Sequence, residues 1–201
     1  MPFRYTRPPV TQHLLVGTVL LIVLAVGHTD WGASAWANLV EGRSPRLLLV
    51  GGLMLLHTLI YWSVGLFFHR VDVSDRPAWV ARHRIQSVRR KHPSLTETTR
   101  VLARNQFLFL PVLLMALGEL LVIRGWRVES ELPSLTRFLL ELAGQAVCAL
   151  VIFYATHRML HRKFWMKHVH RVHHQFRTTT ALASEYAHPI EFAVGNFLTL
   201  A

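Results

Sequence analysis

Apolar residues of this chain gather in four long runs, separated by short polar segments. The runs cover about residues 14–27, 47–68, 107–123 and 138–156. A helix that crosses the hydrocarbon core of a bilayer needs about 17 to 25 mostly apolar residues, and the last three runs reach that length. The pattern predicts an all-α polytopic membrane protein of about four transmembrane helices, followed by a histidine-rich helical cap.

The first run is the shortest and admits a second interpretation. Arg4 and Arg7 precede it, and the small-residue sequence Ala-Trp-Ala follows at 35–37. A basic start, a short apolar stretch and small residues beyond it also fit a secretory signal peptide. Because three further apolar runs follow and no soluble domain is present for export, a membrane span is the favoured interpretation.

Composition agrees with a membrane protein. The 201 residues are 52% hydrophobic and only 16% charged, and the mean hydropathy is +0.31. Ordinary soluble domains carry about 25% charged residues. The composition therefore excludes an ordinary soluble domain.

The distribution of charge predicts the topology. The loop at 70–105 carries nine Arg and Lys residues against three acidic residues, whereas 125–135 has two Glu and one Arg. Loops rich in Arg and Lys stay in the cytoplasm. We therefore expect 70–105 and everything after residue 156 to be cytoplasmic, with 125–135 on the other side.

The net charge of +11 could also suggest a nucleic-acid partner. The basic residues, however, flank apolar runs and form no recognisable nucleic-acid motif. Topology and attraction to anionic lipid headgroups account for them. We therefore expect no nucleic-acid partner.

The apolar runs contain one cysteine and some ionisable side chains. Cys148 is the only cysteine, so the sequence has neither a disulfide framework nor a thiolate metal site. His57 and Glu119 are polar residues at membrane depth, which raises a functional question. Packing or snorkelling is the favoured interpretation of both.

Seven of the thirteen histidines fall between His157 and His188, and five of them form two blocks. In the first block, His157 and His161 are four residues apart and share one face of a helix. In the second block, His170, His173 and His174 have the i, i+3, i+4 spacing that does the same. Neutral imidazole is a good ligand for Fe, Zn, Cu and Ni, so the two blocks predict a metal site.

Two further residues extend this prediction. His188 precedes Pro189, a residue that favours the start of a helix, and Glu191 follows three positions after His188. A carboxylate commonly orients a ligand imidazole by accepting a hydrogen bond from its second nitrogen. We include His188 as a sixth candidate ligand and Glu191 as a residue that orients an imidazole.

The blocks and their surroundings resemble the fatty acid hydroxylase/sterol desaturase superfamily. The similarity rests on His157-Arg-Met-Leu-His161, on His170-Arg-Val-His173-His174-Gln-Phe, and on Ser184-Glu-Tyr-Ala-His188-Pro-Ile-Glu191. The last segment is most similar to C4-methylsterol monooxygenases and fatty-acid-hydroxylase-domain proteins. Arg84-Ile-Gln86 and Asn105-Gln106 are weaker matches to the same branch. The resemblance covers about residues 80–201.

This resemblance implies a non-haem di-iron oxidoreductase that hydroxylates, oxidises or desaturates a lipid, either a sterol or a fatty acyl chain, with dioxygen. It implies iron as cofactor, two irons in a complete site, and electrons from cytochrome b5, a reductase or a comparable donor. The resemblance does not identify any catalytic residue beyond the metal ligands. The membrane would be the endoplasmic reticulum in a eukaryote and the inner membrane in a bacterium.

The sequence departs from the family pattern at two places. Acidic residues commonly stand seven or eight positions before the first block, where this sequence has Ala149 and Leu150. The third histidine block of the family lies beyond residue 201. We therefore expect spans one to three and the basic loop within 1–135, and the N-terminal part of a fatty acid hydroxylase domain, without its C-terminal part, within 136–201. The alternative to an enzyme is a catalytically incomplete membrane metal-binding or interaction protein of the same family.

Cysteine labelling tests the predicted topology. In a Cys148→Ala background, a Ser134→Cys variant should react with a membrane-impermeant maleimide only from the non-cytoplasmic side, because the segment around it is poor in basic residues. Ser94→Cys, in the basic loop, is the matched control and should react only from the cytoplasmic side. Labelling of Ser134→Cys from the cytoplasm would contradict the topology.

Overall fold

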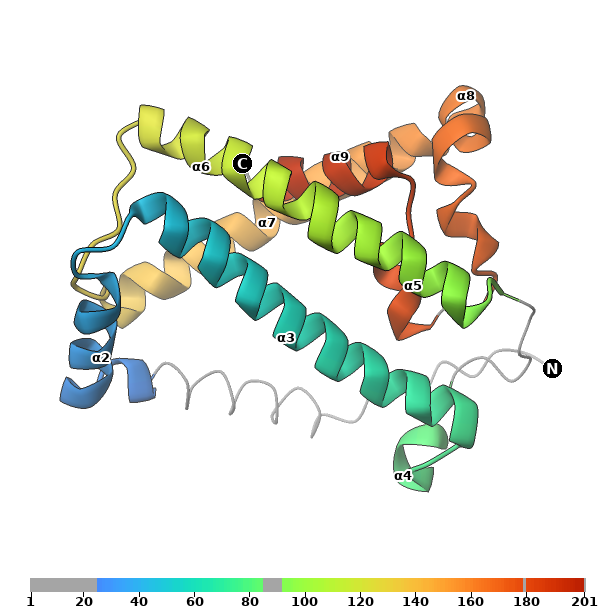
Figure 1. Cartoon of the computed structure of the whole chain (residues 1–201), viewed down its shortest axis with the longest axis horizontal. Coiled ribbons are helices and arrows are strands. Elements are labelled where there is room, and N and C mark those ends of the chain that lie inside the picture. Colours follow the sequence, from blue (N-terminus) through green and yellow to red (C-terminus); the bar gives the residue numbers. More distant parts are fainter. Residues whose placement is uncertain (1–24, 85–91, 179, 201) are drawn as a thin grey trace. The chain divides into compact units, whose positions relative to one another are not determined.

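The computed structural model describes residues 25–84, 92–178 and 180–200, with side chains up to residue 195 (Figure 1). These residues form helices and no strand, which confirms the predicted all-α class. The α-helices are α2 (Asp30–Val40), α3 (Pro45–Ser74), α4 (Ala78–Ala81), α5 (Leu95–Arg104), α6 (Leu110–Ile123), α7 (Leu135–Leu160), α8 (Lys163–Trp165) and α9 (Pro189–Leu200). Two π-helical turns, η1 (Asn105–Phe109) and η2 (Met166–His170), and two 3₁₀ turns, η3 (His173–Gln175) and η4 (Ala181–Glu185), complete them.

Three of the helices are long and apolar enough to cross a membrane. They are Pro45–Ser74, the continuous helix Leu95–Ile123 formed by α5, η1 and α6, and Leu135–Leu160. They contain the second, third and fourth predicted runs and extend beyond each of them. The first predicted run, 14–27, lies almost wholly outside the described residues. The chain is thus an integral membrane protein with three candidate spans in its described part.

The chain divides into two compact units. The first contains residues 25–43 and 127–142, and the second contains 44–126 and 143–201. Within the first, the Trp36 indole Nε1–H donates to the Glu129 carbonyl at 3.0 Å, and His28 Nε2 donates to the Pro133 carbonyl at 3.0 Å. All candidate site residues belong to the second unit.

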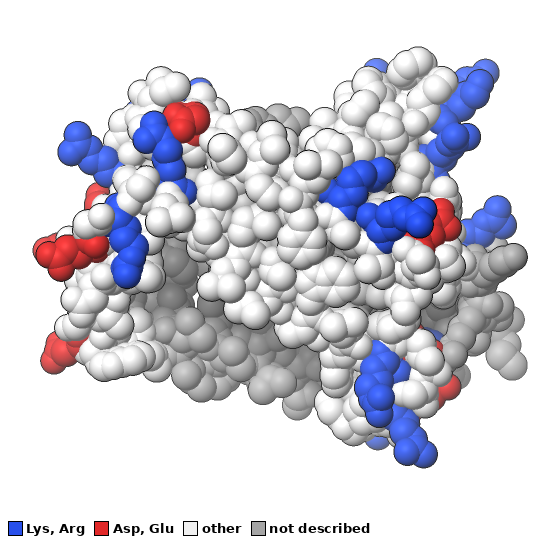
Figure 2. All heavy atoms as spheres, viewed as in Figure 1, with Lys and Arg blue, Asp and Glu red and all other residues white. Residues whose placement is uncertain are grey.

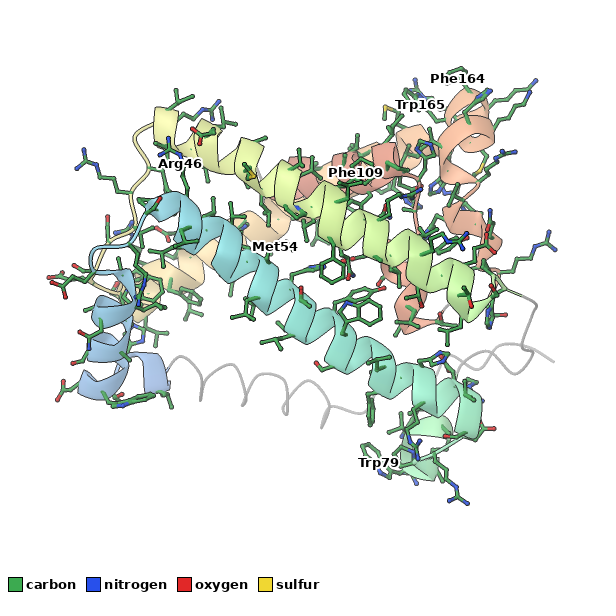
Figure 3. The ribbon with its side chains drawn as sticks, in the orientation of Figure 1. Arg46, Met54, Trp79, Phe109, Phe164 and Trp165 are labelled. Carbon is green, nitrogen blue, oxygen red and sulfur yellow. The ribbon has the colours of Figure 1, made fainter. Side chains whose placement is uncertain are left out.

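The core of the second unit forms where α6 meets α9 and α3. Its buried members are Leu110, Leu114, Ala187 and Phe192, and Met54 and Phe109 pack against them (Figure 3). Many other large apolar side chains on α3, α6 and α7 are exposed. An outer surface of this kind is stable in lipid, where an apolar side chain needs no protein partner.

An ion pair joins α3 and α6 away from this core. Arg46 donates from Nε to Glu119 Oε1 at 2.5 Å and from Nη2 to Oε2 at 2.9 Å. Both side chains are half exposed. Glu119 therefore has a specific two-bond partner, which the expectation of packing or snorkelling did not include.

The π-helical turn η1 lies just before Pro111, the second residue of α6. Proline has no N–H to donate to the carbonyl four residues earlier, and its ring clashes with that carbonyl in a regular α-helix. A wider turn removes the clash, and such π-bulges are frequent at functional sites. The turn also places two polar residues, Asn105 and Gln106, in the protein interior.

Glycine allows η4 to approach α3 closely. A Cβ atom on Gly65 would lie 3.0 Å from Leu182 Cδ2 of η4. Next to this contact, the Tyr61 hydroxyl donates to the Leu182 carbonyl at 2.9 Å. The face of α3 that carries Tyr61 and Gly65 therefore holds the segment that leads to His188.

The basic loop at 70–105 contains the end of α3, the short helix α4 and the helix α5. After α3 ends at Ser74, the four-residue helix α4 carries Trp79, which is 62% exposed, and residues 85–91 lie outside the described part (Figure 3). An exposed indole beside basic residues is typical of segments that lie in the membrane interface.

Replacement of Gly65 tests the close approach. Gly65→Leu should lower the free energy of unfolding by about 1 to 3 kcal/mol, because the added side chain overlaps Leu182 and forces η4 away from α3. Gly52→Leu, on the same helix, is the matched control, since a Cβ atom at that position would meet no atom within 4 Å. Thermal unfolding in detergent measures both, and equal melting temperatures would contradict the packing.

Candidate metal centre

The first histidine block lies where α7 ends. His157 is in the last turn of the helix and His161 follows its final residue, with the His161 N–H still bonded to the His157 carbonyl at 3.2 Å. The i, i+4 spacing places both imidazoles on one side, and their Nε2 atoms are 3.1 Å apart. The chain then becomes extended at Arg162 and turns through α8.

The second block is not the regular helix that the spacing suggested. His170 ends the π-helical turn η2, and His173 and His174 belong to the 3₁₀ turn η3. This departure changes which side chains converge. His170 is fully buried, and its Nε2 lies 3.2 Å from Nε2 of His161.

The structure thus brings three of the six candidate ligands into one group. One ring nitrogen from each of His157, His161 and His170 lies within 4.8 Å of the others, and we call these three residues the imidazole cluster. His174 lies beside it, with its ring centroid 4.5 Å from that of His170. The ring of His173 stacks on that of His170, at 5.7 Å between centroids.

His168 stays outside the cluster, although it belongs to the same turn. Its Nδ1–H donates to the Phe164 carbonyl at 2.9 Å, and its ring packs on the Phe164 ring. Its position agrees with helical spacing, which places His168 and His170 on different sides.

Two separations within the imidazole cluster fit ligands of a single metal ion. Two neighbouring imidazole nitrogens at about 2.0–2.1 Å from one ion are separated by about 2.8–3.4 Å in octahedral or tetrahedral coordination. The observed Nε2 separations of 3.1 and 3.2 Å match this range. Lone pairs that face each other at this distance need a proton or a cation between them, so the residues fit a bound metal ion.

Glu191 holds the buried member of the cluster. Its Oε1 lies 2.7 Å from Nδ1 of His170, while its Oε2 is buried with no hydrogen-bond partner among the described residues. Burial raises the pKa of Glu191 to about 8 and lowers that of His170 to about 4, to which the neighbouring imidazoles contribute. A cation on Nε2 of His170 would favour the ionised carboxylate, which accepts the Nδ1 proton.

His188 lies outside the imidazole cluster. Its Nδ1 accepts a hydrogen bond from the Ile190 N–H at 3.2 Å, so it caps the first turn of α9. In a neutral imidazole that accepts at Nδ1, the proton is on Nε2. Burial, and then the charge of Arg104, lower the pKa of His188.

A buried group of polar residues supports the segment just before His188. Gln106 accepts from the Trp62 indole at 2.8 Å and donates to Glu185 Oε2 at 2.6 Å, and His57 Nε2 lies 3.3 Å from Glu185 Oε1. From the sequence, a packing or snorkelling role is expected for His57, and Gln106 and Glu185 are only part of the segments that resemble the family. The feature of the sequence that could have identified this group is the presence of amide and imidazole side chains within or beside apolar runs.

Tyr186 connects this segment to the second block. Its hydroxyl lies 2.8 Å from Gln175 Oε1 and 3.2 Å from Glu97 Oε1. Burial, together with the Glu97 charge, raises its pKa to about 12. The ring also packs edge-on against Phe176.

A cavity of about 450 Å³ opens beside His173. Its walls come from the end of α3, from the second block and from η4, and they are mostly apolar. The lining residues are Phe68, Asp72, His173, Phe176, Thr180, Ala181, Ala183 and Ser184. A cavity of this size and lining can accept part of an apolar ligand.

Comparisons with known proteins agree with the histidine pattern. Residues 142–201 match the sequence model of the fatty acid hydroxylase family. The chain is 33% identical over 183 residues to human fatty acid hydroxylase domain-containing protein 2, covering 84% of this chain and 54% of that protein. It is 31% identical to methylsterol monooxygenase 2-2 of Arabidopsis thaliana and to a very-long-chain aldehyde decarbonylase of Oryza sativa, with 83% of this chain and 62% of each relative covered. The chain thus spans about half to three fifths of the length of these relatives, and no solved structure matches it.

The protonation of Glu191 predicts how the stability of the metal-free protein depends on pH. Between its ordinary pKa of 4.5 and about 8, the folded state keeps a proton that the unfolded state has lost, so stability falls as pH rises through this window. Glu191→Gln removes this loss. Between pH 5 and pH 8.5, the free energy of unfolding of the variant should rise relative to that of the wild type by on the order of a few kcal/mol.

Thermal unfolding in the presence of a chelator measures the difference. Glu41→Gln, at a solvent-exposed position, reports the effect of the charge change alone. If the melting temperatures of Glu191→Gln and of the wild type depend on pH in the same way, burial does not keep the Glu191 carboxyl protonated.

Proposed function

Because the chain belongs to the fatty acid hydroxylase/sterol desaturase superfamily, we propose that it is a membrane lipid hydroxylase whose imidazole cluster binds iron. The observation that carries this proposal is that ring nitrogens of His157, His161 and His170 lie within 4.8 Å of one another, at the end of a candidate span. Neutral imidazoles suit iron, and the separations of His161 from His157 and from His170 fit ligands of one ion.

Iron at this position would supply the activation of dioxygen that breaking an unactivated C–H bond requires, since side-chain acid and base groups cannot do this. The protein provides the ligands and their orientation. Glu191 fixes the ring of His170 and selects Nε2 as its metal-binding nitrogen. The remaining candidates, His173, His174 and His188, are the proposed ligands of a second iron. His188 would have to release the Ile190 N–H to serve.

The cavity beside His173 is the proposed path for the lipid. Phe68 and Phe176 form apolar walls, and the cavity reaches the second histidine block. A sterol or an acyl chain that enters between α3 and η4 would bring its reactive carbon toward the imidazoles. Hydroxylation, oxidation and desaturation are all compatible with such a site, because each begins at a C–H bond.

Hydroxylation with dioxygen consumes two electrons and two protons, so the proposed reaction needs an electron donor. The end of the molecule around α8 and η2 carries exposed basic side chains, and Figure 2 shows Lys and Arg gathered there. They are Arg158, Arg162, Lys163, Lys167 and Arg171. A donor with an acidic surface, such as a cytochrome b5 or a reductase, fits this charge. By the positive-inside rule this end is proposed to face the cytoplasm.

Single replacements in the imidazole cluster test the function. His161→Ala and His170→Ala should each reduce bound iron and oxygenated lipid product by at least about tenfold, because a tridentate group loses one ligand. His168→Ala is the matched control, since this histidine lies in the same turn but bonds to a carbonyl. Iron content is measured on protein in lipid nanodiscs, and products from sterol and fatty acyl substrates are measured by mass spectrometry. Unchanged iron binding in His161→Ala and His170→Ala would refute the assignment.

A further inference from the structure

Asn105 uses its whole side-chain amide to hold the backbone before His188. Its Nδ2 donates to the Glu185 carbonyl and to the Ala187 carbonyl, each at 3.0 Å. Its Oδ1 accepts from Arg104 at 3.1 and 3.2 Å, and Arg104 also donates to the Ala187 carbonyl at 3.2 Å. The side chain is 0% exposed. No other residue type offers two donors and an acceptor with this size and shape.

The two carbonyls need these donors because Glu185 is the last residue of η4 and Ala187 lies in a segment that is neither helix nor strand. Residues 186–188 lie between η4 and α9, and Tyr186 and Ala187 are buried. A buried carbonyl without a donor costs on the order of 1 to 3 kcal/mol. The amide of Asn105 therefore fixes a backbone conformation that the segment could not keep by itself.

This conformation determines where Glu191 lies. His188 caps α9, which begins at Pro189, and Phe192 anchors the first turn in the core beside Ala187 and Leu110. Glu191 is in that turn and reaches His170 at 2.7 Å. The helix α9 contacts both η1, which carries Asn105, and η2, which carries His170.

We propose that Asn105 is a positioning residue for the metal site, which acts by holding the Glu185–Ala187 backbone so that Glu191 meets Nδ1 of His170. The π-helical turn is what directs Asn105 into this position. The inference rests on the proposed function because the effect it predicts is on metal affinity. It also predicts that the effect of replacing Asn105 depends on the presence of Glu191.

A double-mutant cycle with Co²⁺ alone as the probe tests the dependence. In the full chain in lipid nanodiscs, Asn105→Leu and Glu191→Gln should each weaken Co²⁺ binding about tenfold, the lower end of the usual effect of such supporting residues. The double variant should also bind about tenfold more weakly than the wild type, not about a hundredfold, because Asn105 acts through Glu191. Asn105→Asp serves as a second variant, since it keeps the size and the acceptor for Arg104 but has no N–H.

Leu102→Ala is the control for a general loss of stability. Leu102 is fully buried in α5, and its truncation costs about 2 to 5 kcal/mol of stability. Its apolar side chain has no donor for the Glu185 and Ala187 carbonyls. It should leave Co²⁺ affinity within about twofold of the wild type. Wild-type affinity in both Asn105 variants, or independent effects of Asn105→Leu and Glu191→Gln, would overturn the proposal.

A measurement without metal separates this proposal from the proposed function. The ¹⁵N resonance of His170 Nδ1, assigned by its change in Glu191→Gln, reports the bond to Glu191. It should shift toward its Glu191→Gln position in the Asn105 variants and stay unchanged in Leu102→Ala. If the wild type binds no Co²⁺ while this shift is present, the metal site fails and the positioning role stands. An unshifted resonance in the Asn105 variants would overturn the positioning role.

Discussion

The candidate metal centre depends on hydrogen bonds that side chains donate to backbone carbonyls without a partner in their own segment. Between η4 and α9 the chain crosses the interior of the second unit without regular structure, and its carbonyls are paired by Asn105 and Arg104. In an apolar environment each such bond is worth more than at a surface, because the alternative is an unpaired polar group rather than one bonded to water. The fixed direction of α9, and with it the contact between Glu191 and His170, follows from this constraint.

Local patterns account for much of what the sequence predicts correctly. The apolar runs predict three of the long helices because lipid requires helical backbone and apolar side chains over a fixed length. The spacing of His157 and His161 predicts their convergence because both lie on, or just after, one regular helix. The fatty acid hydroxylase resemblance is confirmed by the family match at residues 142–201.

The remainder of the site depends on departures from regular helix, which periodicity does not reveal. His170 ends a π-helical turn and His173 lies in a 3₁₀ turn, so α-helical spacing does not give the arrangement of their rings, which stack on each other. The roles of Asn105 and Gln106 could not be predicted either. Their partners are about 80 residues away, and a polar residue at the start of an apolar run does not identify its partner. The assignment of the histidines as iron ligands stays a prediction.

The length of α3 has a consequence for the way a lipid would reach the cavity if the proposed function holds. Its 30 residues rise about 45 Å at about 1.5 Å each, against a hydrocarbon core of about 30 Å. Even a tilt of about 40°, at the upper end of the usual range, leaves about 34 Å along the membrane normal. One end must therefore project, and the polar sequence from His69 onward makes it the end that carries the cavity wall at Phe68 and Asp72. The opening then lies at the depth where the headgroups of lipids meet their chains, so that a lipid could insert its tail sideways while its polar end stays hydrated.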